Sequence, residues 1–275
     1  MAIKTWLCTG DTHGTFERFY PSAFTVEDPK STAIIILGDA GVNYYLNRRD
    51  VELKSAARRF AFRFYLVRGN HEARPQDIEG MELIYDEDVR GNVYCEPDYP
   101  NIRYFLDGGF YNIGGKNTLV IGGAYSVDKM YRLTRGWSWF ANEQLDADER
   151  AHITDCVKDY LTDGNHLDLV LTHTAPIGFE PTEMFLDFID QDYVDKSMEI
   201  WLQTIYDLIP KDCFFLFGHY HGDLIMGDNI AMLYERVIDL SYVDTFDSPS
   251  VEPPEGFRFA RPYQYERESR GLPLF

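Results

Sequence analysis

Short apolar segments alternate with amphipathic segments along most of this chain. The apolar segments are rich in β-branched and aromatic residues and have few polar positions, as expected of strands that are covered on both faces. They comprise residues 5–9, 32–37, 62–67, 119–123, 167–171 and 214–217. We predict a β-strand for each of them.

The amphipathic segments have the period of an α-helix. They comprise residues 50–60, 149–161 and 194–209. In the last of them Met198, Trp201, Leu202 and Ile205 fall on one side, and Pro210 ends the pattern. Strands that alternate with helices require crossover connections, so the sequence predicts a layered α/β fold.

The pattern changes after Val243. The remaining residues have mixed charges and no long hydrophobic period, and they include Pro249, Pro253, Pro254, Pro262 and Pro273. We therefore predict one domain formed by residues 1–243. Residues 244–275 are predicted to be a Pro-rich C-terminal tail, either extended along the domain or partly disordered.

Composition and charge narrow the class of protein. With 275 residues and 45% hydrophobic residues, the chain can bury a full core. Its net charge of −19 opposes the neutralisation of many phosphates, so long nucleic acid is not an expected partner. No apolar run reaches the ~18 residues that a membrane span needs, and Lys4 and Asp11 interrupt the N-terminal segment. Cys8 and Cys213 lie in apolar segments as expected of buried free thiols, so we expect a cytoplasmic protein without a membrane partner.

Polar residues of a particular kind follow the predicted strands. They form the motifs Asp11-Thr12-His13, Gly38-Asp39, Gly69-Asn70-His71-Glu72, His173 and Gly218-His219-Tyr220-His221. Five of the seven histidines lie in these motifs, and only His152 and His166 lie outside them. In α/β sheets the functional sites lie at the carboxyl ends of strands, and carboxylates, amide oxygens and imidazoles bind divalent metals. The order of the motifs therefore predicts a site for two divalent metal ions.

The motifs resemble those of the calcineurin-like metallophosphoesterase superfamily. Its pattern is D-x-H, G-D, G-N-H-[DE], H and G-H-x-H, and all five elements occur here in order. The resemblance implies a four-layer α/β/β/α sandwich of two mixed sheets flanked by helices. It also implies that Asp11, His13 and His221 hold one metal, that Asn70, His173 and His219 hold the other, and that Asp39 bridges both.

The same resemblance implies a mechanism. Two divalent ions, with manganese favoured over iron, zinc or nickel, lie ~3.5–4 Å apart and share a hydroxide that attacks the phosphate. His71 assists the leaving group, either as a general acid or by stabilising the transition state. Glu72 has a supporting role, next to a ligand or as a helix cap, rather than a catalytic one.

The residues that follow Asp39 differ from those of one branch of the superfamily, the phosphoprotein phosphatases. Phosphoprotein phosphatases carry G-D-x-x-D-R-G, whereas Val42 and Asn43 stand here in place of the second Asp and the Arg. The Asp would orient the catalytic His, and the Arg would bind phosphate. The sequence therefore favours a stand-alone phosphoesterase of the bacterial or phage type over a protein Ser/Thr phosphatase.

Three cations follow the glycine pair Gly122-Gly123. Lys129, Arg132 and Arg135 are predicted to contact the phosphate of the substrate, and the alternative is a surface loop whose cations face water. Residues 179–193, which follow His173, are predicted to form a rim for specificity. Their acidic character suits a compact substrate better than a polyanion.

The leading hypothesis is a dinuclear metal-dependent hydrolase of phosphate monoesters or diesters, with a small phosphoester as its substrate. One alternative is an inactive scaffold that binds proteins, as the metallophosphoesterase-like subunit of retromer does. Another is a phosphoesterase for nucleotides or nucleic-acid ends. The complete set of ligands together with His71 favours an enzyme, while the substrate and the oligomeric state stay open.

Overall fold

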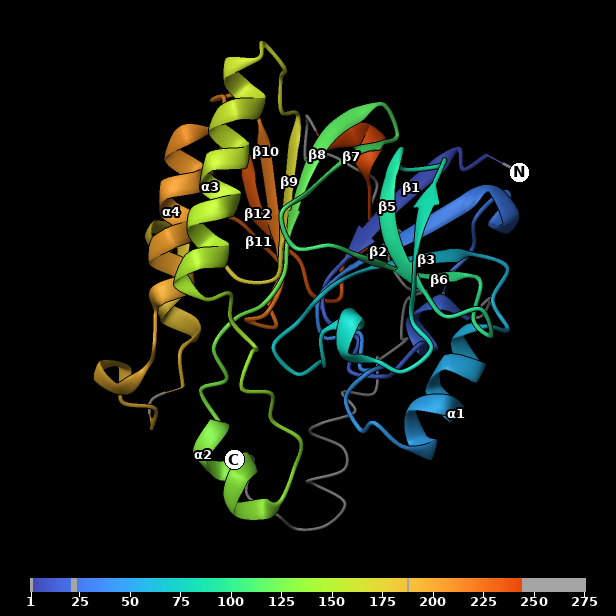
Figure 1. Ribbon diagram of the computed structural model, residues 1–275, viewed down its shortest axis with the longest axis horizontal. Helices are drawn as coiled ribbons and strands as arrows, with labels where there is room; N and C mark the ends of the chain where they lie inside the picture. The colour runs from blue at the N-terminus through green and yellow to red at the C-terminus, as the bar shows by residue number, and fades with distance from the viewer. Residues whose placement is uncertain (1, 21–23, 187, 244–275) are drawn as a thin grey trace.

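The computed structural model describes residues 2–20, 24–186 and 188–243, and the predicted tail of residues 244–275 lies outside them. Two β-sheets pack face to face in the centre of the molecule (Figure 1). The first is a seven-stranded sheet with the strand order β13-β1-β2-β3-β6-β5-β4. Its strands are β1 (Thr5–Thr9), β2 (Thr32–Leu37), β3 (Arg63–Val67), β4 (Glu82–Asp86), β5 (Gly91–Cys95), β6 (Ile102–Phe105) and β13 (Ile238–Asp239).

The second sheet has six strands in the order β11-β12-β10-β9-β8-β7. They are β7 (Gly109–Ile113), β8 (Lys116–Ile121), β9 (Leu169–Thr172), β10 (Phe214–Phe217), β11 (Leu224–Ile225) and β12 (Ile230–Met232). The α-helices are α1 (Arg48–Ala57), α2 (Lys129–Arg135), α3 (Ala147–Thr162) and α4 (Ser197–Leu208). Among the described residues, no helix has both the length and the apolar character needed to cross a membrane.

Both sheets are mixed, and their central strands are parallel. In the first sheet β1, β2, β3 and β6 run in the same direction, and β4, β5 and β13 form antiparallel pairs at the edges. In the second sheet β8, β9, β10 and β12 are parallel, with β7 and β11 antiparallel. The carboxyl ends of the parallel strands thus meet at one edge of each sheet.

Alternation of side chains along the strands builds the layers. In β2, Ile35 and Leu37 belong to the core between the sheets, whereas Ile34 and Ile36 pack on the outer face with Ala57 of α1. In β10, Leu216 faces the first sheet, and Phe215 and Phe217 face the core that contains residues of α3 and α4. The predicted four-layer α/β/β/α arrangement is therefore confirmed, and both faces of these strands are buried, as the apolar segments indicated.

The predicted elements agree with the observed ones to different degrees. The predicted strands 5–9, 32–37 and 214–217 have the observed bounds, and the three predicted helices correspond to α1, α3 and α4 with shifted ends. Helix α2, which follows Gly123, was not predicted, and the alternative of a surface loop is wrong for residues 129–135. Cys8 and Cys213 are buried free thiols, as predicted.

Candidate metal centre

The predicted ligands converge where the two sheets meet. Asp11, Asp39 and Asn70 follow β1, β2 and β3, and His173 and His219 follow β9 and β10. His219 N–H donates to Asp11 Oδ1 and so joins the edges of the two sheets, and Gly218 N–H donates to the His173 carbonyl within the second sheet (2.9 Å each). The motifs are thus brought together by the parallel order of the strands and by the packing of the two sheets.

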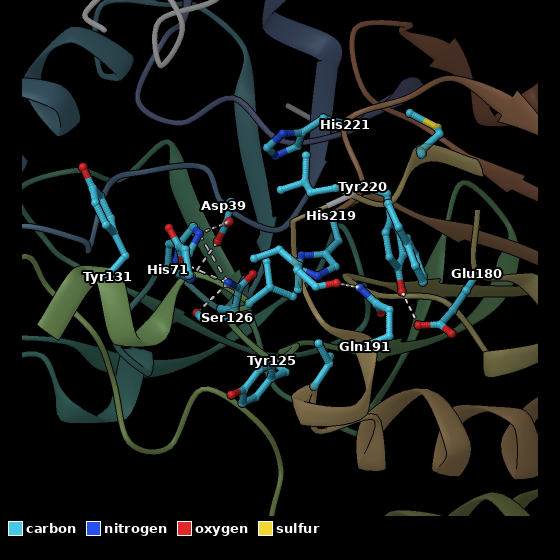
Figure 2. A pocket seen from close by; sticks show the side chains of 18 of the residues that line it. Asp39, His71, Tyr125, Ser126, Tyr131, Glu180, Gln191, His219, Tyr220 and His221 are labelled. Carbon is cyan, nitrogen blue, oxygen red and sulfur yellow. Dashed lines mark hydrogen bonds and ion pairs between the residues drawn. The ribbon is translucent and has the colours of Figure 1, made fainter. Parts of the chain in front are cut away.

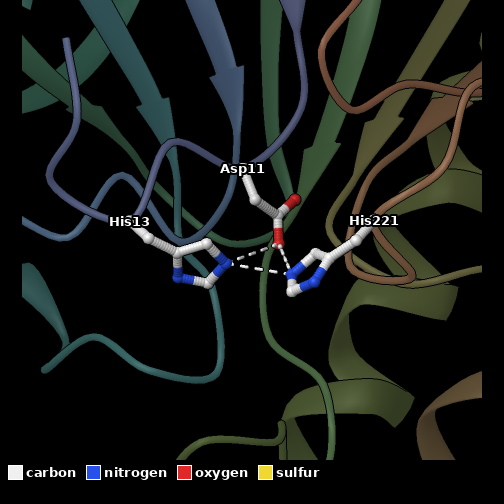
Figure 3. A group of neighbouring side chains, drawn as sticks. All are labelled: Asp11, His13 and His221. Atoms are coloured by element: carbon white, nitrogen blue, oxygen red, sulfur yellow. Dashed lines mark hydrogen bonds and ion pairs between the residues drawn. The ribbon is translucent and has the colours of Figure 1, made fainter. Parts of the chain in front are cut away.

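Asp11, His13 and His221 form the first group (Figure 3). The Asp11 carboxylate points between the two imidazoles, and its Oδ2 atom lies 3.8 Å from His13 Nε2 and 3.3 Å from His221 Nε2. The two Nε2 atoms are 2.9 Å apart. Asp11 Oδ2 is buried and has no hydrogen-bond partner among the described residues. A cation between these three side chains would supply that partner.

Asp39, Asn70 and His173 form the second group, next to the first. His173 Nε2 lies 3.8 Å from Asp39 Oδ2 and 2.8 Å from Asn70 Oδ1. His173 Nδ1 donates to the Leu37 carbonyl (2.7 Å), which leaves Nε2 as the nitrogen available to a metal. The ring of His219 lies against that of His173, with 4.9 Å between their centroids. Asp11 also lies within 4.8 Å of the ligand atoms of Asp39 and His173, so the two groups are contiguous.

The backbone around the ligands is strained. His13, Asp39, His219 and His221 all have positive φ angles, between 45° and 71°, which side chains other than glycine rarely adopt. Strain of this kind costs on the order of 1–3 kcal/mol per residue and is concentrated at functional sites. The strained turns direct the four side chains toward one another.

The glycines of the motifs provide the space for this convergence. A Cβ atom at Gly38 would overlap the His173 ring, and one at Gly69 would overlap the Asp39 carboxylate. A Cβ atom at Gly218 would overlap the Asp11 carboxylate in the same way. Each glycine therefore allows a ligand from another strand to approach its backbone closely.

Neighbouring polar groups fix the orientation of the ligands. His71 N–H donates to Asp39 Oδ1 (2.9 Å), which leaves Oδ2 facing the imidazoles. Asn70 Nδ2 donates to Ser126 Oγ (2.9 Å), and Ser126 Oγ donates to Glu143 (2.5 Å). These two consecutive hydrogen bonds place the Asn70 carbonyl oxygen, rather than its NH₂ group, next to His173.

Glu72 connects two of the loops that carry candidate ligands. Its carboxylate accepts hydrogen bonds from Gly41 N–H (2.8 Å) and Gly69 N–H (3.1 Å), and the side chain is buried. The expectation of a supporting role thus agrees with its contacts. No α-helix begins at Glu72 in the described chain, so the alternative that Glu72 caps a helix is wrong.

The electrostatics of the centre suit cations. Burial and the nearby charge of Asp11 raise the pKa of Asp39, because two buried carboxylates repel each other when no positive ion lies between them. Burial lowers the pKa values of His13, His173 and His219, which keeps these imidazoles in the neutral form that binds metal. The set of oxygen and imidazole donors therefore fits divalent ions such as Mn²⁺, Fe²⁺ or Zn²⁺.

The profile of the calcineurin-like phosphoesterase family matches residues 5–223. The chain belongs to this family. The matched residues include all seven candidate ligands, and the observed fold has the two sheets and flanking helices that the resemblance implied. Members of the calcineurin-like phosphoesterase family bind divalent metals, and the two groups of side chains described above are the candidate ligands of this chain.

Comparison with other proteins adds only distant similarity. Among curated proteins, none matches the chain significantly. One crystal structure is 17% identical and covers 86% of this chain and 95% of its own, with a TM-score of 0.45. The phosphopantetheinyl hydrolase PptH from Mycobacterium tuberculosis is 16% identical over 85% of this chain and 89% of its own (TM-score 0.43). The Aquifex aeolicus protein AQ665, described as of unknown function, is 13% identical over 74% of this chain and 99% of its own (TM-score 0.29).

His71, the predicted catalytic residue, lies beside this calcineurin-like centre. Its Nε2 atom is 3.9 Å from Asp39 Oδ2 and 2.9 Å from Nη2 of the buried Arg132. Arg132 also donates to Tyr44 OH (2.8 Å) and to Asp128 (2.7 Å). Val42, which stands where phosphoprotein phosphatases have the orienting Asp, packs in the core, and Arg132 contacts the imidazole instead.

A cavity of about 610 Å³ opens from the metal centre (Figure 2). His13, Asp39, Asn70, His71 and both histidines of the last motif line it, together with Arg132 and residues from 125–131, 180–186 and 188–194. The segment predicted as a rim thus lies at the cavity. The other two predicted cations are directed elsewhere, since Lys129 Nζ lies 4.1 Å from the Trp139 ring centroid and the Arg135 guanidinium lies 5.2 Å from that of Tyr131.

Sequence reasoning did not find the supporting residues Ser126 and Glu143, nor the contact between Arg132 and His71. Ser126 and Arg132 lie in the segment after Gly122-Gly123 that was predicted to contact the substrate. Nothing in the sequence indicated that Ser126 would contact Asn70 or that Arg132 would contact His71. Glu143 carried no signal, because one Glu in an irregular segment is typical of a surface. Its burial and its two hydrogen bonds from Ser126 are properties of the folded chain.

Proposed function

We propose that this protein is a dinuclear metal-dependent hydrolase of phosphate monoesters or diesters. The observation that carries the proposal is the convergence of the seven candidate ligands, with Asp11 Oδ2 buried between His13 and His221, at the end of a cavity that also contains His71. Asp11, His13 and His221 would hold one ion, Asn70, His173 and His219 the other, and Asp39 both. When bound, the two ions supply a water nucleophile of lowered pKa and positive charge that polarises the phosphoryl oxygens.

The remaining chemistry belongs to side chains of this chain. His71 lies at the edge of the centre, where its imidazole would face the oxygen of the leaving alcohol. Arg132 lies beside His71 and lines the cavity, so its guanidinium, which contacts the imidazole in this structure, would bind a phosphoryl oxygen of the substrate. Phosphoryl transfer depends mainly on positioning and on stabilisation of charge, and both are functions that these residues would serve.

Metal binding and turnover test the proposal together. The protein is purified without chelator, reconstituted with Mn²⁺ and analysed for metal content. It is then assayed with p-nitrophenyl phosphate, bis-p-nitrophenyl phosphate and nucleotides. We expect two ions per chain and metal-dependent hydrolysis of at least one of the small esters. Substoichiometric metal together with no hydrolysis would instead support the scaffold hypothesis.

The role of Arg132 gives a separate prediction. Arg132→Gln is expected to raise KM for the dianionic monoester more than for the monoanionic diester. It is also expected to lower kcat/KM by about 10- to 100-fold, in line with the ~1.5–3 kcal/mol of a hydrogen bond to a charged group. Steady-state kinetics on both esters measures the difference.

Arg135→Gln is the matched control, because Arg135 lies on the same helix α2 but is directed toward Tyr131. Its kinetics should stay within about twofold of the wild type, as expected for an exposed cation. Equal losses of kcat/KM in the two variants would mean that Arg132 does not bind the phosphate. Thermal unfolding of both proteins shows whether the loss of the Asp128 partner has affected the fold.

A further inference from the structure

The cavity has two chemically different parts. One end is the metal centre, and the remaining wall consists largely of aliphatic, methionine and aromatic side chains. Half-buried Phe185, Leu186, Ile189 and Val194 form the inner wall, which comes from the irregular segment between β9 and α4. Wall composition of this kind is typical of pockets that bind the apolar part of a small molecule.

The lip of the cavity exposes apolar side chains to solvent. Met130 on α2 is 69% exposed and Phe188 is 61% exposed, and both line the cavity. Val127 and Met184 are exposed beside them. Helix α2 and the segment before α4 both lie beyond the carboxyl ends of the strands (Figure 1). A contiguous apolar surface at the mouth of a site marks a position where an apolar ligand group is buried.

The charges of the wall restrict the ligand further. Among the described residues that line the cavity, Arg132 is the one Lys or Arg, and it lies beside His71 at the metal end, where it forms an ion pair with Asp128, which also lines the cavity (2.7 Å). Away from the metals the wall contains Glu180, which is paired with Lys196 (2.8 Å), and the buried Glu199. Glu199 accepts a hydrogen bond from Thr174 (2.8 Å) through one oxygen, and its other oxygen has no partner in the part of the chain that the structure describes. A second anionic group on the substrate would meet these carboxylates instead of a cation.

We propose that the substrate carries a single phosphate group on an uncharged, apolar organic group, which the wall formed by α2, residues 184–186 and residues 188–194 holds. This inference rests on the proposed phosphoesterase function and names the class of substrate. It excludes nucleoside polyphosphates and nucleic-acid ends as preferred substrates, because their additional phosphates would lack countercharges. Alkyl and aryl phosphoesters are the chemical class that fits both parts of the cavity.

Affinity for alkylphosphonates tests this proposal independently of turnover. Methyl-, butyl- and hexylphosphonate are titrated calorimetrically into the Mn²⁺-loaded protein. We expect the Kd to fall by about two- to fourfold for each added methylene, as expected for a methylene that becomes partly or fully buried. An alkylphosphonate of the same length with a terminal carboxylate should bind at least tenfold more weakly. A Kd that is independent of chain length would overturn the inference.

Two exposed positions at the lip allow a variant with a matched control. The double variant Met130→Ser with Phe188→Ser should flatten the dependence of Kd on chain length. In the control, Leu133→Ser is combined with Tyr193→Ser. These residues are 48% and 82% exposed, lie on α2 and in the segment before α4, and do not line the cavity. The control should keep the wild-type dependence, and an equal loss in both double variants would contradict the assigned wall.

Turnover of the corresponding alkyl phosphates distinguishes a failure of the proposed hydrolase function from a failure of the proposed substrate class. If the loaded enzyme hydrolyses p-nitrophenyl phosphate while Kd is insensitive to chain length, the function holds and the substrate class is wrong. If no ester is hydrolysed but longer phosphonates bind more tightly, the wall holds apolar groups and the hydrolase function is wrong.

Discussion

Replacement of Asp39 by Asn is expected to remove both metal ions and to reduce turnover to background. Asp39 Oδ1 accepts the His71 N–H in the folded protein, and the side-chain oxygen of Asn can accept the same hydrogen bond. The substitution therefore preserves the shape of the loop but removes the charge that would lie between two cations. Metal analysis of the purified variant and assays at saturating Mn²⁺ measure the two effects.

The stability of the Asp39→Asn protein should change in a characteristic way. Asp11 and Asp39 are both buried, and their ligand atoms lie within 4.8 Å of each other, so the metal-free wild type contains an unrelieved repulsion. The metal-free variant should unfold at the same temperature as the metal-free wild type or at a higher one. The wild type should gain ~2.7 kcal/mol from each of the two ions when free metal is 100 times Kd, or roughly 10–20 °C in Tm in total, and the variant should lose this gain.

Asp50→Asn is the matched control for the loss of a buried carboxylate. Asp50 is 4% exposed and accepts backbone hydrogen bonds from Tyr45 and Leu46, as Asp39 does from His71, but it lies at the start of α1. It should retain two metals and the stabilisation by Mn²⁺. An Asp39→Asn protein that also kept two ions and normal turnover would assign the bridging position to another residue, of which Asp11 is the nearest candidate.

The central part of the fold was predictable because its strands are buried on both faces. Continuous apolar segments such as residues 32–37 have no other stable environment, and the motif after each one marks its carboxyl end. The edge strand β4 was not predicted, since its burial pattern is mostly exposed and Leu83 and Tyr85 face solvent. Helix α2 was missed for a similar reason, because its one buried residue is Arg132, which gives no apolar periodicity.

The convergence of the candidate ligands was predictable from the sequence to a greater extent than their surroundings. Short motifs at strand ends carry Asp11, His13 and the other candidate ligands, so the order of the parallel strands brings together those that belong to the same sheet. The contact between His71 and Arg132 joins residues that are 61 positions apart in the sequence. Arg132 lies on α2, which follows strand β8 of the second sheet, whereas His71 follows β3 of the first. Such a contact depends on how the two sheets pack, which no local pattern encodes.

The role of His71 can be resolved by varying the leaving group. His71→Ala is expected to lower kcat by ~10²–10⁴-fold, the usual contribution of a positioned acid or base, while two metals remain bound. Metal should be retained because His71 is not among the candidate ligands and its Nε2 contacts Arg132. His166→Ala is the control, since His166 is half exposed and pairs with Asp168 and Asp212 outside the cavity. Its kcat should be unchanged.

The contact with Arg132 makes the leaving-group experiment informative. A guanidinium has no acceptor, so in this arrangement His71 Nε2 is the acceptor and carries no proton. To protonate a leaving alcohol through Nε2, the imidazole must first lose its hydrogen bond from Arg132 and become protonated. The phosphoryl group of the substrate would then accept the hydrogen bond from the guanidinium. In that case His71→Ala should reduce kcat far more for alkyl phosphates, whose alkoxide leaves poorly, than for p-nitrophenyl phosphate. Equal losses for both leaving groups would mean that His71 acts by stabilising charge on the phosphoryl oxygens.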